Sequence, residues 1–268
     1  MNIAVISPQL HNSGNTTLSI LIALELASRG KKICLSHADK ESSSFYSYFN
    51  MVNYEDRTST PSQVVKLIRE GELKPSDISD YCKNVAPNLE VFANNSKAFS
   101  SDDMEVMVEY MHKSFPHDYI VFDVDVGVYD VYSNKLSKKV VEYSDAVVIN
   151  LTQSIKQLET FLDRKDKIMN AIGNRPVVVV INKFCEIQST VKEVAGWMGI
   201  KRPNNWLVLR YNPWLAWGTN HGKIIQVFNA MKKGDERLLD IASDVVKIGD
   251  AIVKIKTQIS KTKAGVAG

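Results

Sequence analysis

The sequence lacks long apolar runs and has few cysteines. No apolar stretch approaches the roughly 18 residues that a membrane-spanning helix needs, and no basic segment opens the chain, so we expect neither a membrane span nor a signal peptide. The three cysteines, Cys34, Cys82 and Cys185, lack the paired spacing of a disulfide framework, which indicates reduced thiols in a cytoplasmic protein. A net charge of +3 is too small to predict binding to nucleic acid or to an anionic membrane.

The composition that remains is that of an ordinary globular protein. Apolar residues make up 44% of the chain and charged residues 24%. A chain of 268 residues buries roughly 75% of its unfolded surface when it folds. Because no repeat or low-complexity linker divides the chain, we expect residues 1–268 to form a single domain.

The most informative segment covers residues 3–39. It reads as a buried strand, a polar loop, a helix that ends at a glycine and a second buried strand, in the ranges 3–6, 8–15, 16–30 and 32–36. This order and length are typical of one right-handed βαβ unit with a loop of the size that binds phosphate.

The loop itself keeps about half of a phosphate-binding motif. A complete P-loop has glycines at both ends, a lysine for the β- and γ-phosphates and a Ser or Thr that ligates magnesium. Counted back from Thr16, the lysine position is Asn15, and Gly14 is the only glycine that remains. Thr16 and Thr17 are in place, so the spacing alone is a weak indication of a nucleotide site.

A second strand leads to a carboxylate. Residues 119–122 are apolar and end at Asp123, which is the form of a Walker B strand whose carboxylate holds magnesium or its water. The alternative is a strand followed by a turn, in which Asp123 and Asp125 merely cap a helix at residues 134–142.

Two β-branched runs, at residues 146–149 and 177–181, predict central parallel strands that are buried on both faces. We expect one helix between them, from Ser154 to about Ala171, with Ile155 facing inward. Asn182 and Lys183 follow the second run, as in the Asn-Lys-x-Asp box of a GTPase. Cys185 stands where a GTPase would have the aspartate that pairs with guanine, which disfavours guanine.

Together these segments resemble the MinD/ParA family of deviant Walker A ATPases, TadZ-like proteins included. The resemblance rests on residues 13–18, on residues 24–33 with the closing Asp39, and on the Asp-Tyr-apolar-Asp pattern at 118–123, and it covers about residues 1–235. Leu10 and Asn15 replace the family's two loop lysines, and His37 replaces the first aspartate of the closing pair.

The resemblance implies a doubly wound, mainly parallel sheet with helices on both faces, which binds ligands at the carboxyl ends of its strands. It implies ATP or ADP with magnesium. The resemblance implies that the loop binds the phosphates and that a hydroxyl and a carboxylate hold magnesium. It implies that an amide and a proline-containing loop contact the base, and that a second carboxylate holds the attacking water. The residues concerned are Ser13, Gly14, Asn15, Thr16 and Thr17 for phosphate, Thr16 and Asp123 for magnesium, Asn182 and Pro213 for the base, and Asp39 for catalysis.

The resemblance also implies a homodimer that positions a cargo together with protein partners of a division, partition, pilus or secretion system. Cationic groups at a phosphoryl-transfer site are worth roughly 10³–10⁵ in rate, so the loss of both lysines predicts little or no ATP hydrolysis. Because no basic stripe is evident, direct contact with DNA is disfavoured.

An alternative function stays open. His11 and Asn12 add side chains where phosphates would approach, which is consistent with a non-enzymatic interaction module whose pocket binds no nucleotide. Exposed aromatic residues would then bind partners, although packing against the body is the more common fate of such residues. The candidates are Phe45, Tyr46, Tyr48, Trp214 and Trp217.

Residues 236–262 predict a C-terminal amphipathic helix. Its apolar residues recur every three or four positions, and Leu239, Val246 and Val253 widen the stripe. The resemblance invites membrane docking by this helix, but its first half is acidic and it contains no Trp or Phe. We therefore expect the helix to pack against its own subunit or a dimer mate, with membrane docking the minority outcome.

Overall fold

The computed structural model describes residues 1–7, 13–37, 45–51, 61–92, 101–124, 135–199 and 206–266. Five residues named above, Leu10, His11, Asn12, Asp39 and Asp125, lie outside these ranges. The catalytic role expected for Asp39 therefore stays a prediction.

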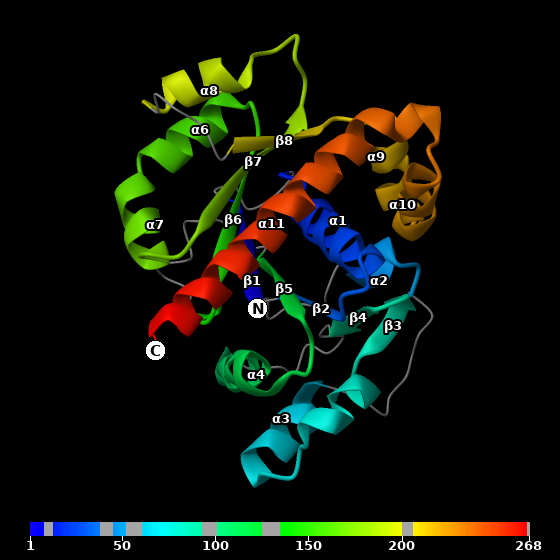
Figure 1. Cartoon of the computed structure of the whole chain (residues 1–268), viewed down its shortest axis with the longest axis vertical. Helices are drawn as coiled ribbons and strands as arrows, with labels where there is room; N and C mark the ends of the chain where they lie inside the picture. The colour runs from blue at the N-terminus through cyan, green and yellow to red at the C-terminus, as the bar shows by residue number, and fades with distance from the viewer. Residues whose placement is uncertain are drawn as a thin grey trace.

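Among the described residues, eight strands form one sheet in the order β3-β4-β2-β5-β1-β6-β7-β8 (Figure 1). The strands are β1 (Asn2–Ile6), β2 (Ile33–His37), β3 (Lys83–Ala86), β4 (Leu89–Phe92), β5 (Tyr119–Val124), β6 (Ala146–Leu151), β7 (Val177–Phe184) and β8 (Trp206–Arg210). All neighbouring pairs are parallel except β3 and β4. This confirms the predicted mainly parallel sheet, whose central β1 has β5 and β6 on its two sides.

Helices cover both faces of the sheet, as predicted. One apolar cluster joins the sheet to α1 (Asn15–Ser28), α2 (Phe45–Tyr48), α9 (Pro213–Asn220), α10 (Ile224–Lys232) and α11 (Leu239–Val266). The other cluster joins the opposite face to α3 (Pro61–Glu70), α4 (Ser101–Ser114), α5 (Lys135–Glu142), α6 (Ile155–Leu162), α7 (Lys165–Ile172) and α8 (Val191–Trp197). Short 3₁₀ helices lie at Pro75–Tyr81 and Glu236–Leu238.

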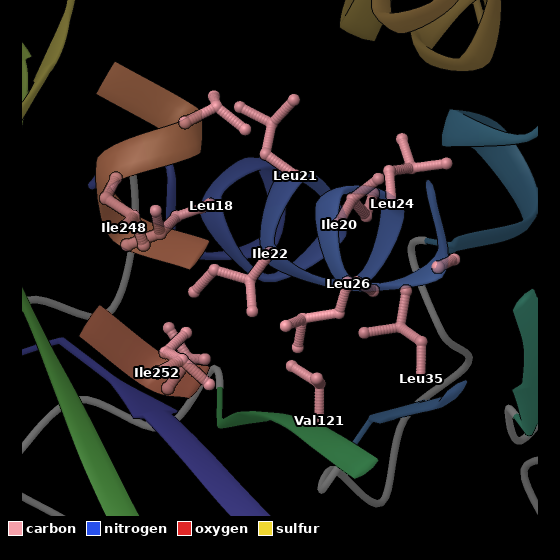
Figure 2. Packing of buried hydrophobic residues seen from close by; sticks show 14 of the residues in the cluster. Leu18, Ile20, Leu21, Ile22, Leu24, Leu26, Leu35, Val121, Ile248 and Ile252 are labelled. Atoms are coloured by element: carbon pink, nitrogen blue, oxygen red, sulfur yellow. The ribbon is translucent and has the colours of Figure 1, made fainter. Parts of the chain in front are cut away.

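Helix α1 is enclosed on all sides. The sequence predicts one apolar face, formed by Ile20, Leu21, Leu24 and Ala27. The structure buries that face and also Leu18, Ile22 and Leu26 on the opposite side of the helix. Figure 2 shows α1 over the strands that carry Leu35 and Val121, with Ile248 and Ile252 of α11 beside it. The helix that starts at the candidate site is therefore in the middle of the core, and its position is fixed by packing.

Helix α11 packs against its own subunit, as the sequence favoured. It crosses the outer side of α1 and reaches β8 (Figure 1), and its inward residues are buried. These are Ile241, Val245, Ile248, Ile252 and Ile255, with Leu238 just before the helix. The apolar stripe is narrower than predicted because Leu239 and Val246 are exposed. No helix in the described ranges is long and apolar enough to span a membrane.

Ion pairs fix α11 at two points along its contact. Arg29 Nη1 on α1 lies 2.7 Å from Asp250 Oδ1, and Arg29 Nη2 donates to the carbonyl of Val246. Near β8, Arg210 Nη1 lies 2.6 Å from Asp244 Oδ1. Burial raises the pKa of Asp244, and the neighbouring Arg210 opposes that shift. The polar contacts thus specify where α11 sits on an otherwise apolar surface.

Two expectations for the connecting elements were wrong. The helix predicted from Ser154 to Ala171 is divided into α6 and α7, because Arg164 leaves helical geometry at φ −126°. Ile155, predicted to face inward, is 62% exposed at the first turn of α6. The edge strand β3 was not predicted, since its four residues carry no apolar alternation.

Asp118 gives a test of how the amino ends of the strands are joined. Its carboxylate accepts a hydrogen bond from the Lys32 backbone N–H and lies near Lys256, and the pKa of Asp118 is lowered, mainly by that hydrogen bond. A lowered native pKa stabilises the fold above the unfolded value, and the benefit is lost as pH falls through the native value. We expect Asp118→Ala to unfold at lower urea than the wild type at pH 7. The difference should shrink below the ordinary pKa of 3.8.

A difference in urea midpoint that is the same at pH 7 and at pH 3 would contradict this assignment. Glu109→Ala is a suitable control, because Glu109 is partly exposed on α4 and its ion pair with Lys113 lies within one helix. Such pairs contribute only a few tenths of a kcal/mol.

Candidate functional site

Gly14 forms the turn between the loop and α1. It is the N-cap of the helix, with φ at +72°, a left-handed conformation that strains other residues. A Cβ at this position would lie 2.9 Å from Asn182 Nδ2. Glycine is thus required both by the backbone conformation and by the close approach of the Asn182 side chain.

The first turn of α1 is suited to an anion. No side chain caps it and no acidic residue lies in it, so its backbone N–H groups face no competing carboxylate. Thr16 is buried and Thr17 is partly exposed in this turn. Phosphate oxygens are the groups that such a helix end binds.

Asn15 does not point to where a phosphate would lie. It is 3% exposed, and its Nδ2 donates to Asp123 Oδ1 at 2.8 Å and to the carbonyl of Val5 at 3.0 Å. A longer contact, of 3.3 Å, reaches the carbonyl of Val124. The residue at the lysine position therefore joins the loop to β1 and β5, and it supplies no positive charge.

Asp123 is completely buried and only half satisfied. Its Oδ1 accepts hydrogen bonds from Asn15 Nδ2 and from Ser19 Oγ at 3.1 Å. Its Oδ2 has no hydrogen bond within the described residues and lies 3.5 Å from His37 Nε2. A buried carboxylate oxygen without a donor costs free energy. An oxygen of this kind suits a cation ligand better than a purely structural role.

Two amides hold the loop to the neighbouring strands. Asn182 Nδ2, near the end of β7, donates to the carbonyls of Ser13 at 3.0 Å and Gly14 at 3.1 Å. Asn150 Nδ2, on β6, donates to Asn15 Oδ1 at 3.2 Å and to the Ser13 carbonyl at 3.3 Å. The contact of Asn182 with a base stays a prediction, and the hydrogen bonds of its amide fix the loop.

Lys183 brings a cationic side chain to the loop from β7. A bulge at this position gives it a φ of +53°, and its Cε lies 3.5 Å from the point where a Cβ on Gly14 would be. The end of the Lys183 side chain thus covers Gly14. The sequence motif places its lysines only within the loop and α1, so it did not point to this one.

Pro213 lies at the first position of helix α9, and this corrects the expectation of a proline-containing loop. Asn212 caps this helix, with Oδ1 accepting from the N–H groups of Trp214 and Leu215. A proline at the first helical position is favourable because no intrahelical donor is lost. The residue follows β8, whose Leu209 is in register with Asn182, and its predicted contact with a base stays untested.

The structure brings Ser13, Gly14, Asn15, Asp123 and Asn182 together and places Thr16 in the same turn. It adds four residues that the sequence did not assign to the site: Ser19, His37, Asn150 and Lys183. For Ser19, His37 and Asn150 the available signal was a polar residue inside an apolar run, because such a residue needs a partner when it is buried.

The site offers a metal few protein ligands. Within the described ranges no three His, Cys, Asp or Glu side chains are close enough to hold a metal ion. Magnesium is commonly bound by one or two carboxylates, with water and phosphate completing its octahedron. Asp123 with the Thr16 hydroxyl fits that pattern, whereas a dedicated all-protein metal site does not fit.

The strand order, the glycine turn after β1 and the carboxylate at the end of β5 define a P-loop NTPase-like fold of the MinD/ParA type. No protein-family model and no curated protein matches the sequence.

Solved structures of this type superpose over almost the whole chain. The cell division ATPase MinD of Pyrococcus furiosus has a TM-score of 0.69 at 16% identity, covering 95% of this chain and 99% of its own. The MinD of Pyrococcus horikoshii in complex with Mg-ADP has a TM-score of 0.69 at 15% identity, covering 95% of this chain and 96% of its own. A ParA family ATPase of Chlorobium tepidum TLS has a TM-score of 0.68 at 12% identity, covering 92% of this chain and 98% of its own. At these identities the likeness concerns the fold.

Proposed function

We propose that this protein is a MinD/ParA-like nucleotide-binding protein that binds ATP or ADP with magnesium and hydrolyses ATP slowly or not at all. The observation that carries the proposal is the buried Asp123, whose Oδ2 has no hydrogen bond within the described residues. A pocket that had lost its ligand entirely would gain stability by replacing this carboxylate.

We assign each residue of the candidate site a role in this function. The backbone of Gly14 to Thr17 binds the phosphates at the start of α1, where no side-chain cap competes. Asp123 and Thr16 hold magnesium, which when bound would neutralise phosphate charge. Lys183, whose stem covers Gly14, supplies part of the positive charge that Asn15 does not. In this proposal Asn182 and Pro213 contact the base, and Asp39, which lies outside the described residues, holds the attacking water.

Slow hydrolysis follows from the chemistry of Asn15. Phosphoryl transfer depends on cationic groups that stabilise the transition state, and each contributes roughly 10³–10⁵ in rate. The Asn15 amide is engaged with Asp123 and the Val5 carbonyl, so it cannot take the place of a lysine without breaking those hydrogen bonds. The protein then acts as a nucleotide-dependent binding switch, with nucleotide residence set by affinity.

The biological role that this supports is the positioning of a cargo by a dimer with protein partners. The solved MinD of Aquifex aeolicus forms a complex with MinC, and a related plasmid partition protein from Borrelia burgdorferi was solved with AMPPNP. For the present chain, both the homodimer and the partner are parts of the proposal.

Restoring the lysine tests the proposal directly. We expect isothermal titration of the wild type with Mg-ATP to give saturable binding, and Asn15→Lys to tighten it about 10- to 100-fold, the range for a charge-assisted hydrogen bond of roughly 1.5–3 kcal/mol. Asn15→Met is the matched control, because it has similar length and no charge. It should bind no tighter than the wild type.

Two results would overturn this function. Steady ATP turnover of ordinary size by the wild type, abolished by Thr16→Ala, would refute slow hydrolysis. No binding by the wild type, and no rise in its melting temperature with Mg-ATP or Mg-ADP, would favour the second function, an interaction module without nucleotide. One observation favours this second function: the Asn15 amide already donates a hydrogen bond to Asp123, so that part of the pocket is satisfied without a ligand.

A further inference from the structure

A group of aromatic and cationic side chains lies exposed around helix α9, which begins at Pro213, the residue assigned to the nucleotide base. We call it the α9 patch, and it consists of Tyr211, Trp214, Trp217, His221, Lys223 and Arg237. Trp214 is 42% exposed and Trp217 is 40% exposed. Large aromatic residues at half exposure are unusual on a free surface and common in binding surfaces.

The rings of the patch are fixed by one another and by cations. Trp214 and Trp217 meet edge to face with centroids 6.2 Å apart, and His221 stacks on Trp217 at 5.0 Å. The Arg237 guanidinium lies 4.2 Å from the Trp214 centroid, and Lys223 Nζ lies 5.1 Å from that of Trp217. The surface is therefore pre-organised, which lowers the entropic cost of binding.

Five of the six patch residues, all except Arg237, lie in a part of the chain that has no acidic residue. From residue 194 to residue 234 there is no Asp or Glu, whereas six Lys or Arg occur. Asp235 follows and pairs with Arg237, and the exposed Glu236 is next. Within the described residues Lys223 forms no ion pair, so its charge is available to a partner.

The covered ring faces decide what kind of partner fits. An aromatic face carries negative charge and an aromatic edge carries positive charge. Cations and an imidazole already lie over the Trp214 and Trp217 rings, so a nucleic-acid base finds little free face to stack on. Rings that lie packed against their neighbours do not project as lipid anchors do. What they present are edges, next to Lys223.

We propose that the α9 patch docks an acidic segment of a protein partner, with carboxylates against Lys223 and the ring edges and apolar side chains against Trp214 and Trp217. Trp, Tyr and Arg are the residues that most often dominate protein–protein binding. The inference does not rest on nucleotide binding. It specifies the partner as an acidic protein segment that also carries apolar side chains.

The test uses the full chain without nucleotide and two fluorescein-labelled 16-residue peptides. One alternates Asp and Glu with Leu and Phe, and the other carries Asn and Gln in place of the acids. In fluorescence anisotropy at low salt we expect the acidic peptide to bind at least tenfold more tightly. Trp214→Ala with Trp217→Ala should weaken that binding at least tenfold, and Lys223→Gln about threefold.

Trp197→Ala is the matched control, because Trp197 is 52% exposed on α8 and belongs to the other face of the sheet. It should change the affinity less than twofold. Melting curves establish whether each variant is folded. If the double tryptophan variant does not fold, Lys223→Gln, which keeps every aromatic ring, still tests the proposal. Equal affinity for the two peptides, or an equal loss in Trp197→Ala, would overturn the proposal. So would tighter binding of a 20-residue oligothymidine, or of phosphatidylglycerol vesicles, through the same residues.

Discussion

A chain that ends at residue 235 should not give soluble, folded protein. The removed segment carries six buried aliphatic side chains, from Leu238 to Ile255, in the apolar cluster that also contains α1 and one face of the sheet. Burial of each contributes about 1.5–3 kcal/mol, so the total of roughly 9–18 kcal/mol is as large as the 5–15 kcal/mol by which a typical domain is stable. Comparison of residues 1–235 with the full chain, by solubility after expression and by circular dichroism, measures the effect.

Gly249 allows the same contact to be tested by one methyl group. A Cβ there would lie 2.7 Å from Glu25 Cγ and 2.9 Å from Arg29 Nη2, and both side chains are held by ion pairs. Overpacking of this kind costs about 1–3 kcal/mol, so Gly249→Ala should lower the melting temperature. Gly196→Ala on α8 is the matched control. It has open space, so it should be neutral or stabilising by up to about 1 kcal/mol.

The opposite result has a definite meaning. If residues 1–235 were soluble and as stable as the full chain, and only lost binding to liposomes, α11 would be a membrane anchor and its packing on α1 dispensable. The exposed Leu239 and Val246 would then be the residues to examine first.

The fold could be predicted from the sequence because each central strand is a continuous apolar run. Residues 146–149 and 177–181 have that form. A strand that is buried on both faces lacks the alternation of polar and apolar residues, so its continuous apolar run predicts a central strand. Short segments were read less well. β3 is a four-residue edge strand held mainly by its backbone pairing with β4, and such pairing leaves no mark on side-chain order.

The candidate site could be located from the sequence but not understood from it. The sequence predicted that Gly14, Thr16, Asp39, Asp123 and Asn182 lie at strand ends. The structure brings Gly14, Thr16, Asp123 and Asn182 to one edge of the sheet, and Asp39 lies outside the described residues. The sequence did not indicate that Asn15 turns away from the loop. That choice depends on three acceptors supplied by β1 and β5, at positions about 10 and 110 residues away in sequence.

The orientation of Asn15 leads to the second large effect. Asn15→Asp should destabilise the protein by more than about 3 kcal/mol at neutral pH, because it places a second carboxyl within about 3 Å of the completely buried Asp123. It also removes the donors to the carbonyls of Val5 and Val124. Two carboxylates at that distance cannot both be ionised in a buried site, so the introduced carboxyl takes up a proton and its pKa is raised.

The sign of the pH dependence follows from that shift. A carboxyl whose native pKa is raised imposes no penalty below its unfolded pKa of about 3.9, and the penalty grows as pH rises toward the raised native value. Urea unfolding of Asn15→Asp should therefore approach that of Asn15→Ala near pH 4 and fall well below it at pH 8. Asn15→Ala loses the same hydrogen bonds without adding a charge, so its own loss of stability relative to the wild type should change little with pH.

If Asn15→Asp were as stable as the wild type at pH 8, the side chain at this position would face the loop and solvent. Asn15 would then be free to meet a phosphate, and its hydrogen bonds to Asp123 and Val5 could no longer account for slow hydrolysis.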